Sequence, residues 1–327
     1  MKLLAGAALA LLIVWVYAPS LRGGLVYEDY RSADGCGIVL GDSQPVLSRL
    51  GLTGRGLTRA SWCWQASDPF ALRVVNLGLH LTVTALVAAL AWSLTRERVA
   101  AFLAAAFFGL NAVNVEAVAY LSSRGELLAA IGVLGACLAA LSGRWAASGA
   151  LALFGYLGKE SAVVVVLLAP VVLWYQSGRA WAWVGAGAGI GLAVAIAYLT
   201  SRWFLGPVPA RGAWALVQTS AVARVTLLAV LPFGQTVDYD YLRVPVVLQV
   251  WSAVMVLSGL IWAVLQRRRV LLCGVVWVAC ACAPRLLVPT PESVFSEHQF
   301  YLPLVGVSLI LASLLTQESH GHHCAAL

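Results

Sequence analysis

The sequence predicts an all-α polytopic membrane protein with about ten to eleven transmembrane helices. Of its 327 residues, 61% are hydrophobic and only 11% are charged, whereas a soluble domain carries about 25% charged residues. Apolar stretches close to the roughly 20 residues that cross a bilayer recur along the whole chain. They leave no room for a separate soluble domain, so we expect one membrane domain over residues 1–316 and a cytoplasmic tail over 317–327.

Eleven apolar segments are the candidate spans. The first resembles a signal peptide, but its exit at Tyr17-Ala-Pro-Ser20 is a weak cleavage site, so we expect an uncleaved helix. In chain order the segments are 3–19, 72–94, 98–112, 125–142, 145–157, 160–176, 180–200, 214–233, 245–265, 270–288 and 300–316.

Basic residues in short loops set the expected orientation, because such loops stay in the cytoplasm. A full crossing at 214–233 would put the last basic cluster outside, and this segment carries Gln218 and Arg224 near its middle. A charge at mid-membrane costs a few kcal/mol. We therefore expect a re-entrant or interfacial element there, within an outer loop over 201–244, which leaves ten crossings and both termini in the cytoplasm. The cytoplasmic anchors are Lys2, Arg96, Arg98, Arg144, Arg179, Arg267, Arg268 and Arg269.

The acidic residues are then one-sided. With this topology twelve of the fourteen lie at or near the outer face, and Glu97 and Glu318 are the exceptions. Carboxylates contribute little to membrane orientation, so their segregation indicates a site on the outer face.

Three polar segments carry the main candidate residues. The first outer loop, over 20–71, contains the adjacent carboxylates Glu28 and Asp29. Either one of them acts as a general base and the other helps it, or the two are a charge pair in a solvated loop. In the break over 111–126, Glu116 and Arg124 either face a cavity, where the arginine fork suits phosphate oxygens, or close the loop as a mutual ion pair. Lys159, before a helix that begins at Glu160, either binds an anion or snorkels to the interface.

Two further outer segments combine aromatic and ionisable residues. Asp238 and Asp240 lie in one, and Glu297, His298 and Tyr301 lie in the other. Each fits the interfacial aromatic belt, although His298 has the chemistry of an acid or base near neutral pH.

Composition also bounds cofactors and partners. The seven cysteines show no zinc-ligand spacing, so we expect no thiolate metal site, while Cys36 and Cys63 either pair or remain free thiols. The net charge of +7 comes from scattered arginines, which favours anionic lipid or phosphate as partner and excludes nucleic acid. The histidines over 320–323 are typical of a disordered tail, with weak metal binding as the alternative.

Six motifs in order resemble the bacterial relatives of the transmembrane and tetratricopeptide-repeat O-mannosyltransferases, within the GT-C superfamily. The resemblance covers residues 26–303. Glu28 stands where that family usually has aspartate, and His298 replaces an arginine expected after Glu297. No tetratricopeptide repeats follow, so we expect a partner to supply them or acceptor recruitment to differ. The motifs are 27–29, then 59–62 with 68–80, 115–118 with 123–128, 158–162, 232–234 with 238–240, and Glu297 with 301–303.

The resemblance implies a GT-C-like bundle and an inverting transferase in the bacterial inner membrane, with its active site facing the periplasm. The donor would be a polyprenyl-phosphate sugar, with mannose as the expected sugar, and the acceptor a protein or glycan hydroxyl. Asp29 with Glu28 would act as base, and Arg124 and Lys159 would contact the donor phosphate. The resemblance requires no cofactor, and a catalytic divalent cation beside the carboxylates is the alternative. The rival interpretations are a lipid or solute transporter and a non-catalytic scaffold. The supporting residues are Glu116, Glu160, Asp238, Asp240, Glu297, His298 and Tyr301.

Overall fold

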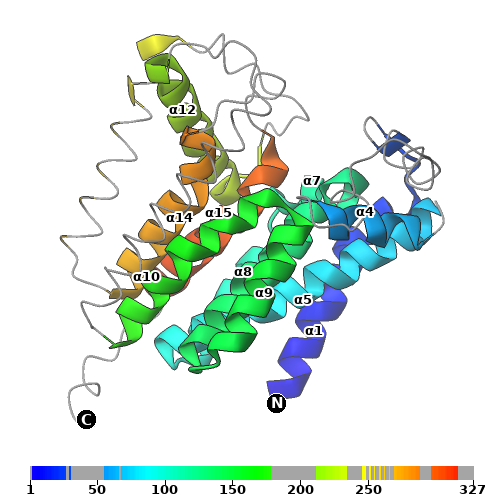
Figure 1. The fold of residues 1–327 in the computed structure, drawn as a ribbon, viewed down its shortest axis with the longest axis horizontal. Coiled ribbons are helices and arrows are strands. Elements are labelled where there is room, and N and C mark those ends of the chain that lie inside the picture. Colours follow the sequence, from blue (N-terminus) through cyan, green and yellow to red (C-terminus); the bar gives the residue numbers. More distant parts are fainter. Residues whose placement is uncertain are drawn as a thin grey trace.

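A computed structural model gives the fold of most of the chain, and Figure 1 shows it as a set of packed helices. The described residues contain helices and turns and no strand, so the all-α class predicted from the sequence is confirmed for them. The model describes residues 2–26, 29–30, 55–65, 68–177, 211–233, 245–247, 250, 251, 254, 258, 261, 265, 269–287 and 296–315.

Four helical units in the described residues are long and apolar enough to cross a membrane. Helix α1 (Lys2–Tyr17) continues into the 3-10 turn η1 (Ala18–Arg22), and α5 covers Pro69–Thr95. Turn η2 (Leu121–Ser123) leads into α8 (Arg124–Leu141). Turn η5 (Glu297–Phe300) leads into α15 (Tyr301–Leu315). Their length and composition are those of membrane-spanning helices.

The remaining apolar helices are shorter or carry polar residues. They are α6 (Arg98–Gly109), α9 (Trp145–Gly158), α10 (Val165–Ser177) after the turn η3 (Glu160–Val164), α12 (Arg211–Val230) and α14 (Arg269–Leu287). Each coincides with a predicted apolar segment. The described residues between 246 and 265 are helical as well, whereas segment 180–200 lies outside the described residues. Helix α6 rises only about 18 Å at 1.5 Å per residue, so the expectation of ten crossings stays a prediction.

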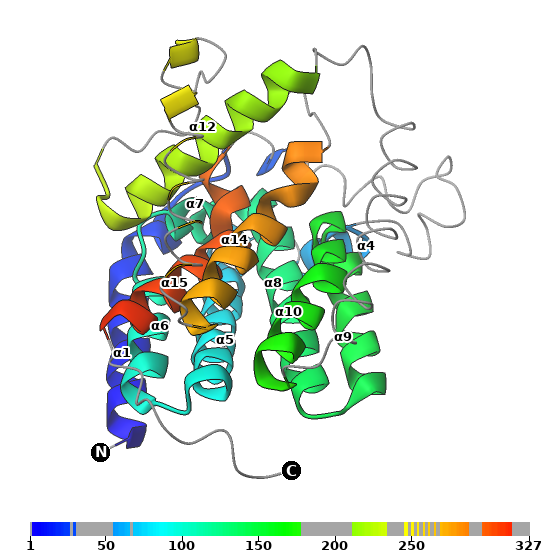
Figure 2. The ribbon, with the colours of Figure 1, turned by 90° about the vertical axis from the view of Figure 1, so that its left-hand side faces the viewer.

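Figures 1 and 2 show how the helices are arranged. Helices α5, α8, α9 and α10 run side by side, and α14 and α15 pack beside them. The N-terminus of α1 lies at the end of the bundle opposite to α4 (Gly56–Cys63) and α7 (Asn114–Ala119). Helix α12 crosses that second end obliquely (Figure 2). Whether it lies in the membrane interface, as the sequence predicts, stays a prediction.

The burial pattern separates a core from apolar outer surfaces. Leu90, Phe108 and Trp277 are fully buried in the largest core cluster. On α1, Leu11 and Trp15 are more than two-thirds exposed. Large apolar side chains on an outer helix face indicate contact with another apolar medium, and lipid chains supply it in a membrane-spanning protein.

A seam of glycines brings α8 and α9 into backbone contact. A Cβ added to Gly132 would lie 2.3 Å from the Cα of Gly155, and one added to Gly158 would lie 2.8 Å from the Cβ of Leu128. Small residues allow membrane helices to approach this closely. The end of α9, which leads to Lys159, is therefore fixed against the first turns of α8.

Candidate functional site

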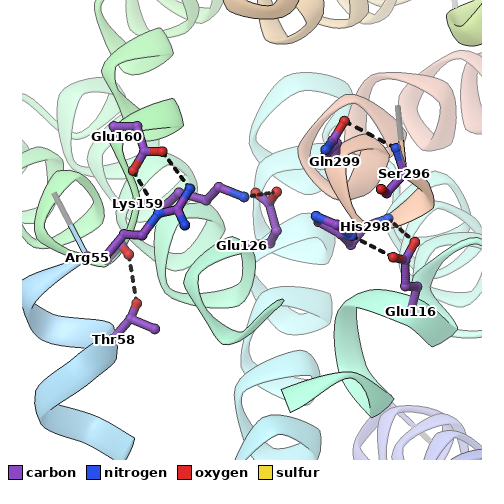
Figure 3. A network of polar contacts seen from close by, with 10 residues as sticks. Arg55, Thr58, Glu116, Glu126, Lys159, Glu160, Ser296, His298 and Gln299 are labelled. Atoms are coloured by element: carbon purple, nitrogen blue, oxygen red, sulfur yellow. Dashed lines mark hydrogen bonds and ion pairs between the residues drawn. The ribbon is translucent and has the colours of Figure 1, made fainter. Parts of the chain in front are cut away.

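Ionisable side chains from distant parts of the chain gather around the N-terminal end of α8, and Figure 3 shows most of them. They come from α7, α8, η3, η5, the segment after η1 and the residues that directly precede α4 and η3. We call this group the ionisable cluster. Its members are Asp29, Arg55, Glu116, Arg124, Glu126, Lys159, Glu160 and His298.

Asp29 is buried and joins the segment after the first helix to η2. Its Oδ1 accepts hydrogen bonds from the backbone N–H and the hydroxyl of Ser122, both at 2.8 Å. Its Oδ2 accepts one from the backbone N–H of Val26 at 3.3 Å. Oδ2 is thus the oxygen with more capacity for a further hydrogen bond. Glu28, the expected helper, lies outside the described residues.

Arg124 is fully buried and is already engaged by oxygens of the protein. Its Nε donates to Oδ1 of Asn76 at 2.7 Å. Its Nη1 donates to Oε1 of Gln65 at 2.6 Å and to the carbonyl of Ser61 at 3.1 Å. Its Nη2 donates to the carbonyl of Leu72 at 2.8 Å.

These contacts differ from both expectations for Arg124. Each nitrogen of the guanidinium already donates within the chain, so little of the fork is left for a donor phosphate. Arg124 also does not pair with Glu116, because Glu116 is held by His298. Arg124 instead ties α8 to α4 and to the start of α5, which is a positioning role.

Lys159 meets Glu126, a partner that the sequence interpretation did not name. Its Nζ lies 2.5 Å from Oε1 of Glu126, and the two side chains are 15% and 7% exposed. Glu126 belongs to the first turn of α8. Its position two residues after Arg124 in the polar break was the available signal, but spacing alone does not show which cation it meets. Lys159 thus lies beside a carboxylate at the first turn of α8, and its contact with a donor phosphate stays a prediction.

Glu160 begins η3 as predicted and forms a two-point ion pair with Arg55. The carboxylate oxygens lie 2.8 Å from Nη2 and 3.1 Å from Nε of Arg55, and both side chains are about half exposed. Exposed pairs of this kind contribute little to the stability of a fold. The pair nevertheless shows that the start of α4 lies against η3. Thr58 adds a hydrogen bond to the carbonyl of Gly158 at 2.7 Å.

Glu116, on α7, contacts His298 at two points. One carboxylate oxygen accepts from Nδ1 of His298 at 2.7 Å, and the other accepts from the backbone N–H of His298 at 2.9 Å. The ring of Tyr120 lies 6.5 Å from the imidazole, centroid to centroid. Glu116 therefore contacts a histidine and not Arg124, so the expected ion pair between Glu116 and Arg124 is wrong.

Tyr301 and Glu297 lie deeper than the aromatic-belt interpretation places them. Tyr301 is fully buried, and its hydroxyl lies 2.7 Å from Nδ1 of His80, whose Nε2 lies 3.0 Å from the carbonyl of Gly109. Because a carbonyl only accepts, Nε2 of His80 carries the hydrogen and Nδ1 accepts from Tyr301. Tyr301 thus supports the core with Phe108, 5.1 Å away between ring centroids.

Three of the residues singled out in the sequence, Asp238, Asp240 and Cys36, lie outside the described residues. Glu297 is described and is buried in η5. In the described parts of the chain, no three His, Cys, Asp or Glu side chains come together as a metal-binding group.

No protein-family model, curated protein or solved structure matches the chain. The resemblance to the O-mannosyltransferases therefore depends on the ordered motifs alone.

Proposed function

We propose that the chain is a multi-pass membrane glycosyltransferase that moves a sugar, mannose first among the candidates, from a polyprenyl-phosphate donor to a hydroxyl group. One observation carries this proposal. Asp29 and Lys159 are far apart in the sequence, yet Asp29 contacts Ser122 and Lys159 contacts Glu126, which lie on either side of Arg124. A carboxylate for the acceptor and a cation for the phosphate are thus fixed to one end of one helix.

The chemical roles follow from charge. As the acceptor oxygen attacks the anomeric carbon, Asp29 takes the hydroxyl proton, and Glu28 assists it. The bond from that carbon to the phosphate oxygen breaks, and negative charge grows on the phosphate. A cation already in place stabilises that charge. Lys159 has three N–H donors, and Glu126 uses one of them.

Arg124 keeps the two halves of this arrangement together. Its hydrogen bonds to Asn76 and Ser61 hold α8 against α5 and α4. Ser122 and Glu126 flank it in the chain and therefore keep their positions relative to Asn76. We assign Arg124 to positioning and Lys159 to the phosphate.

The proposed setting is a bacterial inner membrane with the ionisable cluster facing the periplasm. Ten crossings, with 214–233 as the interfacial or re-entrant element, give that orientation. The acceptor is a protein or glycan hydroxyl, and a partner with tetratricopeptide repeats is one way to recruit it. Apolar outer faces such as that of α1 offer surface for the polyprenyl chain.

The test is sugar transfer by the purified full chain in proteoliposomes, with synthetic polyprenyl-phosphate mannose and hydroxyl acceptors. Asp29→Asn is expected to lower turnover by about 100-fold or more, the usual contribution of a general base. Asp68→Asn is the matched control. Asp68 caps α5 through the backbone N–H groups of Phe70 and Ala71, and asparagine caps as well as aspartate does. Its turnover should equal that of wild type.

Two results would count against the proposal. Equal turnover for Asp29→Asn and wild type removes Asp29 from the mechanism. No transfer by wild type from mannose or other hexose donors removes the transferase function itself.

A non-catalytic scaffold is the second candidate, and one observation favours it. Asp29, Glu116, Glu126 and Glu160 each already have a partner within the chain. Carboxylates that all have partners within the chain are expected of residues that only hold the helices together, and equally of a preorganised active site. A scaffold would bind the lipid donor or a partner without any turnover, which the same proteoliposomes reveal.

A further inference from the structure

His298 has one ring nitrogen fixed by the protein and the other without a protein partner among the described residues. Because a carboxylate only accepts hydrogen bonds, the 2.7 Å contact with Glu116 places a hydrogen on Nδ1 of His298. The contact of 2.9 Å between the second carboxylate oxygen and the backbone N–H of His298 prevents the carboxylate from turning away. Nε2 is therefore the nitrogen that can exchange a proton.

The surroundings of the pair suit a preorganised group. Both side chains are 16% exposed, so neither belongs to a freely solvated surface pair. Ser296 and Gln299 form a capping box that fixes the turn η5 from which His298 projects. In Figure 3 the imidazole extends toward Glu126 and Lys159, so Nε2 points to the side where the proposed phosphate contact lies.

A carboxylate that holds one nitrogen of an imidazole sets its tautomer and leaves the other nitrogen to transfer protons. The leaving group of the proposed reaction is a phosphate monoester, whose oxygens accept hydrogen bonds and protons.

We propose that His298 is a catalytic residue that donates the Nε2 proton to the departing phosphate oxygen, and that Glu116 is its positioning residue. This inference depends on the proposed transferase function. The acceptor oxygen bonds to the anomeric carbon, and its proton moves to Asp29. The carbon–oxygen bond to phosphate breaks, its electron pair stays on the phosphate oxygen, and that oxygen takes the Nε2 proton. Asp29 then gives its proton to water, and water returns one to His298.

Other ionisable side chains lie on the described elements that pack against η5 or face the imidazole. Helices α7, α12 and α15 pack against η5, and Glu126 and Lys159 face it from α8 and the start of η3 (Figure 3). Tyr301 is occupied by His80. The ionisable residues of η5 and of these three helices are Glu116, Arg211, Arg224, Glu297 and Tyr301.

The test compares His298→Gln with His298→Ala in the proteoliposome transfer assay. Glutamine keeps an N–H donor for Glu116 but has no proton to transfer, so a merely structural role predicts normal turnover for it. A proton donor predicts a loss of about 100-fold or more for both variants, with thermal stability near that of wild type for His298→Gln. Added imidazole should restore part of the turnover of His298→Ala and none of that of His298→Gln, which has no space for it.

Glu116→Gln tests the positioning role, because the amide keeps one acceptor and loses the second. Its kcat should fall while the KM for the donor stays unchanged. Wild-type turnover in His298→Gln, or a loss in His298→Ala that imidazole does not relieve, overturns the inference while the transferase proposal stands. No turnover in the wild type removes both.

Discussion

Replacing Arg124 with glutamine is expected to detach α4 from the bundle and to lower the free energy of unfolding by at least about 3 kcal/mol. The guanidinium satisfies the side-chain oxygen of Asn76 and the carbonyls of Ser61 and Leu72, all in buried or partly buried contacts. Each buried acceptor left without a donor costs about 1–3 kcal/mol. Arg124→Lys should lose most of the same contacts, because an ammonium group cannot reach from α8 to both α4 and α5 as the fork does.

Thermal unfolding in detergent and limited proteolysis of residues 55–65 measure this effect. Arg59→Gln is the matched control, since Arg59 is exposed on α4 and surface substitutions usually stay within about 0.5 kcal/mol. If Arg124→Gln were as stable as Arg59→Gln, the guanidinium would not hold the bundle end, and the direct phosphate contact expected from the sequence would return as its role.

Replacing Lys159 with glutamine should leave the carboxylate of Glu126 buried without its cation. Removing one partner of a buried ion pair costs about 3–5 kcal/mol. The double variant Lys159→Gln with Glu126→Gln replaces the ion pair by two amides that still form a hydrogen bond, so it should recover most of the stability. It should not recover donor binding, because the ammonium charge that attracts the phosphate is gone.

The two readouts separate structure from binding. Thermal unfolding of the single and double variants reports the ion pair, and titration with polyprenyl-phosphate mannose reports the phosphate contact. A double variant that binds the donor as tightly as the wild type would show that Lys159 is only a structural partner of Glu126. A single variant as stable as the double variant would show that Glu126 has no need of the cation.

Hydropathy predicted the helices well because it is a local property. The segment 125–142 became α8 at Arg124–Leu141, and 145–157 became α9 at Trp145–Gly158. The short helices α4 and α7 were not predicted, since they lie in polar segments with no apolar run of their own. Glycine at 132 and 155 gave no hint that the two helix backbones touch.

Partner choice within the ionisable cluster could not be predicted in the same way. Charge costs in a membrane correctly indicated that Glu116 and Arg124 need partners, but both occur in one short segment, so they were matched to each other. The fold instead brings His298 to Glu116 from the far end of the chain. It brings the residues of α4 to Arg124. These contacts join residues that are far apart in the chain. Inspection of one sequence does not reveal which of several available groups will form a contact.

The side of the membrane on which the ionisable cluster lies is open to a direct measurement. Trp64 follows α4 at the cluster end and is 90% exposed. Ser142 is exposed at the other end of α8, about 27 Å from Arg124 at 1.5 Å per residue. Single cysteines at these two positions, in a background with the seven native cysteines replaced, report opposite ends of the bundle.

Membrane-impermeant maleimide applied to intact cells should label Trp64→Cys and leave Ser142→Cys unmodified until the membrane is permeabilised. Such a result places Asp29, Lys159 and His298 at the outer face, where the proposed sugar transfer takes place. The reverse pattern would put the cluster in the cytoplasm and contradict transfer at the outer face.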